Sequence, residues 1–310
     1  MPLRRPVPGR ARPRRQIEWP TWIALAACYV GWCGLLALWP VAGAWVLLPV
    51  AVLVTFHSSL QHECLHGHPT RNARLNEALV FPAPGLFVAY RRFRDTHLRH
   101  HNNALLTDPY DDPESWYVAE GDHARLPAPL RLALAACGTL AGRLTLGPFL
   151  SLHGFWRNDI RLIRQGTPGV ARAWGLHALG VLPVLGWLWL CGVPLWAYVA
   201  GAALPGYSLL MIRTFIEHRA GHDPAHRSAV VEAEWPFRLL FLNNALHAVH
   251  HERPAATWYE LPALYAADRE GVLQRNGGYL LGGYREVARR WGLRRREPVV
   301  HPFLRRTPGQ

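Results

Sequence analysis

Eight of the 17 histidines stand in three short clusters whose spacing is that of metal ligands. Imidazole is the commonest metal ligand at neutral pH, and it suits iron, zinc, copper and nickel. A pair four residues apart, or an H-x-x-H-H run, projects its rings from one face of a helix. Because eight imidazoles exceed the needs of one ion, the clusters predict a site for two metals. The eight are His62, His66, His97, His100, His101, His247, His250 and His251.

Residues close to these clusters are weaker candidates. His57 lies about 140° of helical rotation away from the His62 face, so we interpret it as a polar residue at the lipid–water boundary. Packing is favoured over metal binding for Cys64. Ligand imidazoles usually donate their second N–H to a carboxylate or carbonyl. Asn243 and Asn244 are candidates for such outer contacts. Nearby acidic residues either take this role or only balance arginines: Glu63, Asp95, Asp108, Asp111, Asp112, Glu217 and Glu252.

The composition is that of a membrane protein. Hydrophobic residues make up 50% of the 310-residue chain, and charged residues only 18%, below the usual quarter of a soluble protein. The net charge of +13 suggests nucleic-acid binding at first sight, but the basic residues flank apolar stretches and interleave with the histidines, so no nucleic-acid partner is expected. The five cysteines form no C-x-x-C pair and indicate no disulfide framework.

Two long apolar stretches predict four membrane-spanning helices. Residues 19–56 and 173–212 contain no Asp, Glu, Lys or Arg. One crossing needs about 20 apolar residues, so each stretch is long enough for two. Trp39-Pro40 breaks the first stretch and Gly192-Val193-Pro194 breaks the second, as tight turns between antiparallel helices would. The sequence thus predicts an all-α integral membrane protein with two transmembrane hairpins, at about 19–60 and 173–212.

The arginines indicate how the chain is oriented. Six precede the first hairpin, thirteen lie between the hairpins and fifteen follow the second hairpin, so neither hairpin tip carries one. Because positively charged segments stay inside, both termini and the middle segment are predicted to be cytoplasmic, and the expected location is a bacterial inner membrane. Every histidine cluster falls on that same cytoplasmic side.

Two shorter apolar segments are interpreted as interfacial or re-entrant. Residues 78–90 are too few to cross a membrane and include two prolines. Residues 132–152 are long enough, but Arg143 near their centre would cost roughly 2.5–3.5 kcal/mol at the bilayer midplane. The chain end after about Arg294 is basic and contains proline, and it is predicted to be disordered.

His218 is predicted to be a ninth metal ligand. It stands just past the expected cytoplasmic end of the fourth helix, as His62 does past the second. His222 and His226 follow at helical spacing, but Gly221 and Pro224 interrupt any helix there, so both are expected in a loop. The remaining histidines are read as background: His68, His123, His153, His177 and His301.

These motifs resemble those of the membrane fatty acid desaturase and hydroxylase superfamily. The resemblance rests on H-E-C-L-H-G at 62–67, H-L-R-H-H at 97–101 and H-A-V-H-H-E-R-P at 247–254, and it covers about residues 20–265. It implies that a cytosolic helical cap carries the histidines, and that they bind two non-haem irons, which use O₂ to oxidise an unactivated C–H bond. A further histidine after the fourth helix of the family supports His218. The implied organisation is a basic segment over 1–18, a di-iron membrane domain over 19–265 and a basic cytosolic tail over 266–310.

The reaction within this superfamily stays open. Residues 213–219, Asn244 and the W-Y-E-L-P run at 258–262 resemble the branch of carotenoid ketolases and bacterial hydrocarbon oxygenases, and Val249 departs from the acyl desaturase pattern. The main expectation is desaturation or hydroxylation of a lipid chain that arrives from the bilayer, with a carotenoid ketolase or hydroxylase as the alternative. A metal-binding or metal-transport protein is the rival of another class, but transporters usually place ionisable ligands within the crossing helices.

Electrons are expected from outside the chain. The sequence has no G-x-G-x-x-G, no ferredoxin-type cysteine set and no haem signature. We therefore expect an NAD(P)H-linked reductase and a separate ferredoxin- or rubredoxin-type donor. The arginine-rich cytosolic side would favour an acidic carrier through electrostatic steering.

Overall fold

The computed structural model describes residues 17–304, and this part of the chain is predominantly helical, with 64% helix. Four of its helical segments are long and apolar enough to span a membrane. They confirm the predicted fold class of an all-α membrane protein with four spans. The segments are Trp19–Ala37, Trp39–Leu65, Val170–Leu190 and Leu195–Thr214.

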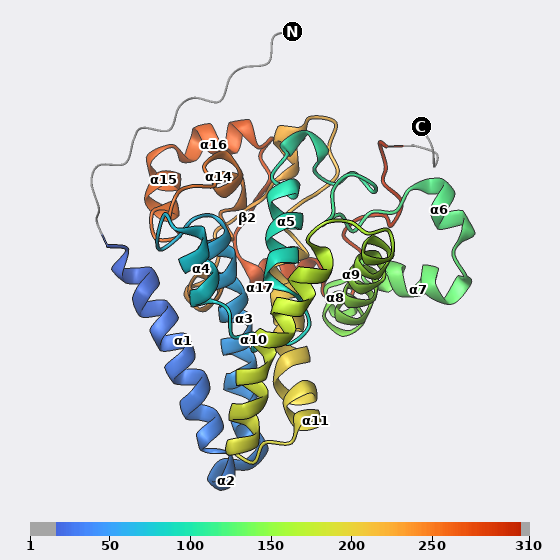
Figure 1. Cartoon of the computed structure of the whole chain (residues 1–310). Coiled ribbons are helices and arrows are strands. Elements are labelled where there is room, and N and C mark those ends of the chain that lie inside the picture. The colour runs from blue at the N-terminus through green and yellow to red at the C-terminus, as the bar shows by residue number, and fades with distance from the viewer. Residues whose placement is uncertain (1–16, 305–310) are drawn as a thin grey trace.

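Within each hairpin, one span ends and the next begins close to the predicted break (Figure 1). The first span is α1 (Trp19–Ala37), and the second is built of α2 (Trp39–Ala42), η1 (Gly43–Val46) and α3 (Leu47–Leu65). The third span is α10 (Val170–Leu190). The fourth consists of α11 (Leu195–Tyr198), the π-helical turn η3 (Val199–Ala203) and α12 (Leu204–Thr214). Gly192, between the third and fourth spans, has a φ of +70°, a conformation that glycine adopts at no steric cost.

The spans pack on one another through a buried apolar cluster and present apolar side chains on their outer faces. Trp32 and Tyr198 join two spans inside this cluster, where the indole Nε1 donates to the tyrosine hydroxyl over 3.0 Å. Near the turns, Trp45, Trp189 and Trp196 are 79%, 80% and 76% exposed. Tryptophans so placed are typical of a membrane interface.

The two helices that lead to the histidines, α3 and α12, pack closely against each other. Gly206 of α12 lies against α3, where a Cβ would come within 2.8 Å of the Ala51 carbonyl oxygen and the Val54 side chain. The Thr55 hydroxyl of α3 donates to the Gly206 carbonyl over 2.8 Å. This contact brings the ends of α3 and α12, and therefore the residues that follow them, to one place.

The rest of the described chain forms a cap at one end of the spans (Figure 1). In the cap, β1 (Val230–Val231) and β2 (Leu280–Leu281) form a short parallel pair. The cap helices before α10 are α4 (Ala73–Leu79), α5 (Tyr90–His100), η2 (Asn103–Leu105), α6 (Glu120–Arg125), α7 (Ala128–Ala136), α8 (Leu140–Thr145) and α9 (Gly147–Arg164). Those after α12 are η4 (Pro224–Arg227), α13 (Trp235–Leu240), α14 (His247–Glu252), α15 (Leu261–Ala267), α16 (Arg269–Arg275) and α17 (Tyr284–Trp291).

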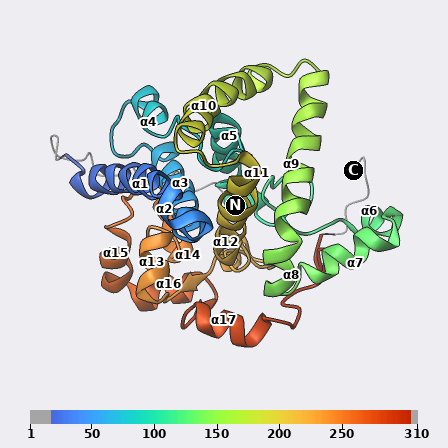
Figure 2. The same cartoon turned by 90° about the horizontal axis from the view of Figure 1, so that it is seen from below.

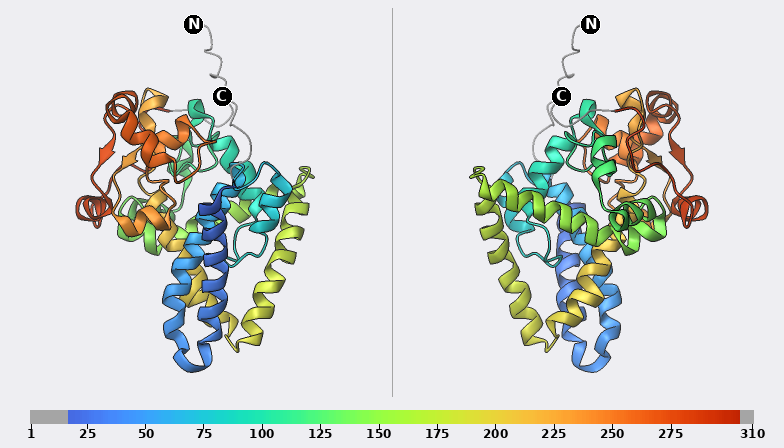
Figure 3. Two further views of the ribbon diagram at one scale, coloured as in Figure 1. Left: turned by 90° about the vertical axis from the view of Figure 1, so that its left-hand side faces the viewer. Right: turned by 90° about the vertical axis from the view of Figure 1, so that its right-hand side faces the viewer.

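The two shorter apolar segments do not form spans. Residues 80–89 are a loop between α4 and α5, and its Ala83 N–H donates to the Gly180 carbonyl of α10 over 3.1 Å. Residues 132–152 are divided among α7, α8 and α9, and α9 lies across the direction of the spans (Figures 2 and 3). Arg143 is buried inside the protein. Its guanidinium lies 3.5 Å from the centroid of the Trp116 ring, and its Nε donates to the Cys137 carbonyl.

The prediction of disorder after Arg294 is wrong as far as residue 304. Arg296 donates to the carbonyls of Phe215 and His218, at the end of the fourth span. Val300 pairs with Val118, and His301 is buried. The basic composition of this segment suggested disorder, but the basic side chain of Arg296 donates to carbonyls of the fold and so holds the segment in place. Residues 1–16 and 305–310 lie outside the described part of the chain.

Candidate metal centre

The first pair of histidines stands at the end of the second span. His62 lies in the last turn of α3 and His66 directly follows the helix, and their ring centroids are 4.7 Å apart. The Nε2 atoms of both rings are buried, and neither has a hydrogen-bond partner. A buried polar atom without a partner is costly, and a metal ion bound to both Nε2 atoms would satisfy them.

Five histidines form the first group. His97 and His101, one turn apart at the end of α5, have Nε2 atoms 3.0 Å from each other. The Nε2 atom of His250, on α14, lies 3.1 Å from that of His101. Together with the pair from α3, each ring offers one nitrogen, and these nitrogens lie within 4.8 Å of one another. The members are His62, His66, His97, His101 and His250.

Four histidines form the second group. His218 follows α12, and its Nε2 lies 2.9 Å from the Nε2 of His100 and 3.0 Å from that of His247. The Nε2 of His251 is 3.1 Å from that of His247. His218 thus belongs with His100, His247 and His251, and not with the pair that ends α3. The structure brings all nine predicted residues together.

Each H-x-x-H-H run contributes to both groups. In the run at 97–101, the outer pair faces the first group and His100 faces the second. In the run at 247–251, the outer pair faces the second group and His250 faces the first. Adjacent residues of a helix are rotated by about 100°, so the neighbouring histidines at the end of each run point to different groups. The repeated motif therefore supplies two adjacent centres from two short helices.

The donor set fits two first-row transition metals. Imidazole nitrogens bind such ions at about 2.1 Å, so two ligands at right angles have nitrogens about 3.0 Å apart. The Nε2–Nε2 distances of 2.9–3.1 Å within both groups agree with this geometry. Six of the nine side chains are buried and three are partly buried, which limits the access of water to them.

The second nitrogen of most rings is held by an acceptor outside the groups. The Nδ1 of His97 lies 2.9 Å from Glu114, and that of His100 lies 2.8 Å from Asp112. The Nδ1 of His251 lies 2.8 Å from the Asn103 amide oxygen. These contacts favour the tautomer with hydrogen on Nδ1, which leaves the Nε2 lone pair free for a metal.

The His247 and His218 rings have similar contacts. The Nδ1 of His247 lies 3.2 Å from the Asn244 amide oxygen and 3.4 Å from Glu217. The Nδ1 of His218 lies 3.3 Å from the Ser228 hydroxyl. Asn244 therefore contacts the second nitrogen of a histidine ring, as the sequence analysis considered.

The acidic residues divide between the two roles left open by the sequence. Asp112 and Glu217 contact histidines of the second group, and a carboxylate oxygen of Glu63 lies 3.8 Å from the Nδ1 of His62 in the first. The others mainly meet cations or backbone: Glu63 accepts from the Trp258 N–H, Asp108 accepts from the Tyr110 N–H, Asp95 pairs with Arg94, Asp111 with Arg99, and Glu252 with Arg275.

Three of the outer contacts, from Glu114, Asn103 and Ser228, were not found from the sequence. Glu114 lies in a turn and Asn103 begins η2, both after α5 and outside any histidine cluster, and no spacing rule points to them. Asn243, by contrast, donates to the Trp258 carbonyl and contacts no ring of the two groups.

Six other histidines make contacts outside both groups. The interpretation of His57 as a residue at the lipid–water boundary is wrong: its side chain is buried and its Nε2 lies 2.9 Å from the Tyr29 hydroxyl. Cys64 packs in an apolar cluster with Leu25 and Leu60. The remaining contacts are His68 with Glu18, His177 with the Leu86 carbonyl, His222 with Phe303, His226 with Asp223 and His301 with Thr107.

The surroundings of His101 and His100 shift the pKa values of the two rings in opposite directions. Burial, with the neighbouring His97 and His100, lowers the pKa of His101 to about 3. Burial also acts to lower the pKa of His100, but Glu114 and Asp112 outweigh it and raise that pKa to about 9. Burial acts to raise the pKa of Glu114, yet His97 and His100 hold it well below the usual range. The ionised Glu114 carboxylate suits a site that must balance cations.

Comparison with known families gives one match. The model of the family described as fatty acid desaturase matches residues 38–281, which include every residue of both histidine groups. No curated protein matches the chain.

Proposed function

Because the chain belongs to the fatty acid desaturase family, we propose that it is a membrane-bound, O₂-dependent oxidoreductase that oxidises an unactivated C–H bond of a lipid chain. The family implies a desaturase or hydroxylase type of oxidoreductase. The proposed cofactor is a pair of non-haem irons, one held by each histidine group. Desaturation or hydroxylation is the proposed reaction.

One observation carries this proposal. Nine imidazoles from four separate segments of the chain turn their Nε2 atoms into two adjacent groups. Histidines outside the groups direct a ring nitrogen to another kind of side chain, as His57 does to the Tyr29 hydroxyl and His68 to Glu18. Here Nε2 atoms face one another at about hydrogen-bond distance, an arrangement that suits shared metal ions far better than mutual hydrogen bonding.

The residues of the chain would hold the irons and their surroundings. When bound, the two irons supply the activation of O₂ and the oxidising power needed to break a C–H bond. Glu114 and Asp112 fix the rings of His97 and His100 through Nδ1. Arg213 pairs with Glu217 over 2.9 Å, which holds that carboxylate beside His247. Burial of the rings excludes water.

The position of the groups suits a substrate from the bilayer and electrons from the cytoplasm. The groups lie where α3 and α12 end, directly beyond the apolar spans. A lipid chain would reach them along the apolar side, and a separate ferredoxin- or rubredoxin-type donor would approach from the cap. Exposed arginines such as Arg99 and Arg253 flank the histidine runs and would attract an acidic donor.

Two measurements test the proposal. Elemental analysis of the purified protein should find two irons per chain; a reproducible single metal, or zinc after expression with excess iron, would refute the di-iron site. Lipid and pigment profiles of cells with and without the gene should differ by double bonds or hydroxyl groups on acyl chains. A change confined to keto or hydroxy groups of carotenoids would overturn the proposed substrate in favour of the pigment alternative.

A further inference from the structure

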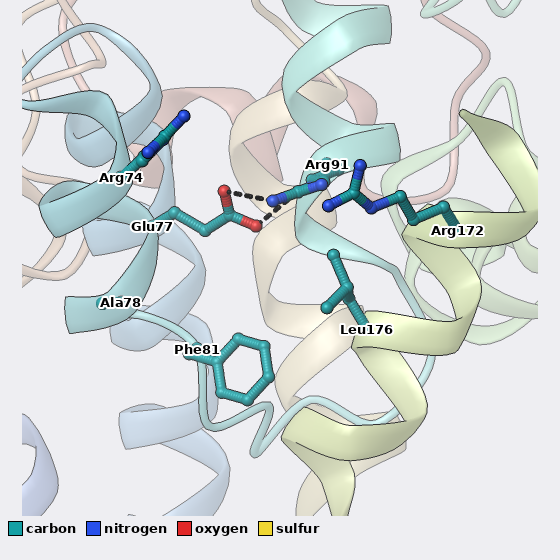
Figure 4. A pocket seen from close by; sticks show the side chains of 7 residues that line it. All are labelled: Arg74, Glu77, Ala78, Phe81, Arg91, Arg172 and Leu176. Atoms are coloured by element: carbon teal, nitrogen blue, oxygen red, sulfur yellow. Dashed lines mark hydrogen bonds and ion pairs between the residues drawn. The ribbon is translucent and has the colours of Figure 1, made fainter. Parts of the chain in front are cut away.

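A groove of about 730 Å³ lies apart from the histidine groups, between α4, α5 and α10 (Figure 4). Arginines from all three helices reach into it: Arg74 from α4, Arg91 from α5 and Arg172 from α10. Figure 2 also shows these helices as neighbours on one side of the molecule. The proposed reaction uses none of these residues.

The charge in the groove is not balanced. Arg91 makes a two-pronged salt bridge with Glu77, with nitrogen–oxygen distances of 2.5 and 3.1 Å. Arg74 and Arg172 are exposed and make no ion pair within the described residues 17–304. The three guanidinium groups and one carboxylate leave two net positive charges, so the groove favours an anion.

The floor of the groove is apolar. Phe81 and Leu176 project below the charged groups in Figure 4. On α10, Arg172, Leu176 and Leu179 follow one another at spacings of four and three residues, so they lie on one helix face. Leu179 is 54% exposed. A charged upper part therefore continues into an exposed apolar stripe along the third span.

The depth of the groove matches the boundary of the membrane. Arg172 lies in the first turn of α10, which begins the candidate span Val170–Leu190, and Leu179 lies within that span. Phosphates of a bilayer lie at the level where a spanning helix leaves the apolar core, and its acyl chains run beside the helix. A ligand with a phosphate at the arginines and a chain along α10 fits both parts.

We propose that this groove binds one anionic phospholipid, with its phosphate on Arg74 and Arg172 and an acyl chain along Leu176 and Leu179. Glu77 would disfavour a second phosphate on the lipid and is able to accept from a headgroup hydroxyl. Phosphatidylglycerol brings one net negative charge to the two free arginines. The quaternary ammonium of phosphatidylcholine cancels the charge of its phosphate, so phosphatidylglycerol should bind more tightly than phosphatidylcholine. The lipid is a bound partner, distinct from the substrate.

Native mass spectrometry of the full chain in a neutral detergent tests this assignment. The protein is titrated with phosphatidylglycerol, phosphatidylcholine or water-soluble glycerol phosphate, and the bound fraction is counted. Wild type should retain one phosphatidylglycerol. The double variant Arg74→Gln, Arg172→Gln should bind it on the order of tenfold more weakly, since each arginine near a lipid surface contributes a several-fold change in affinity.

The matched control removes two exposed arginines from α9, Arg157→Gln with Arg164→Gln, and should bind like wild type. Size-exclusion profiles of both variants verify that they remain folded. Equal retention of phosphatidylglycerol by the groove variant and the control would overturn the site. Equal binding of phosphatidylcholine would overturn the charge argument, and equal binding of glycerol phosphate would overturn the assignment to a lipid.

Discussion

Replacing His218 tests the assignment of the second histidine group most directly. Its Nε2 lies 2.9 Å and 3.0 Å from those of His100 and His247, so His218→Ala removes the nitrogen at the centre of a group of four. Only three imidazoles would remain there, while the first group keeps all five. We expect the iron content to fall from two per chain to about one.

The expected loss of activity is large. Loss of a single outer contact to a metal ligand typically costs 10–100-fold in affinity or activity, and loss of the ligand itself should cost on the order of 100-fold or more. The ring makes few other contacts that stabilise the fold, because its Nδ1 has only a 3.3 Å contact with Ser228. Product formation per unit of membrane protein, with iron per chain, is the assay.

His57→Gln is the matched control. His57 is buried in α3 five residues before His62, but its Nε2 contacts the Tyr29 hydroxyl, which in turn donates to the Leu79 carbonyl. Glutamine keeps a donor for Tyr29, so we expect substantial activity and unchanged iron. Near-normal turnover of His218→Ala combined with an inactive His57→Gln would refute the ligand assignment and place the start of the first cluster at His57.

Three further predictions follow from other parts of the structure. Glu114→Gln should speed the loss of iron to a chelator and lower activity by about 10–100-fold, while Glu252→Gln, whose partner is Arg275, should change both little. Reporter fusions at the N-terminus, Gly166 and the C-terminus should all report a cytoplasmic location; an extracytoplasmic signal at Gly166 would require a further crossing. Burial, assisted by Arg227, lowers the pKa of His301 to about 4, below its unfolded value of about 6.5. Stability of the C-terminal segment should therefore fall as the pH drops from about 6.5 to 4, and His301→Gln should flatten this part of a thermal-unfolding profile against pH; an unchanged slope would contradict the burial argument.

Local periodicity was enough to predict the spans and the composition of the candidate site. Helix length and charge-free sequence define a span residue by residue, so the four spans and the breaks near Pro40 and Pro194 follow from neighbouring residues alone. The position of two residues one turn apart on a helix, such as His97 and His101, also follows from their spacing in the sequence. All nine predicted histidines lie in the two groups, and their role as iron ligands stays a prediction.

Only the tertiary structure decided how the nine rings are divided between the two groups. The sequence does not show that His100 joins His218 while its neighbour His101 joins His250, because this depends on where α5, α12 and α14 meet. Glu114 and the ordered Arg296 escaped prediction for the same reason: their partners lie 17 and about 80 residues away along the chain. Helix geometry is fixed by residues one turn apart, whereas a buried polar group finds its partner through the packing of distant segments.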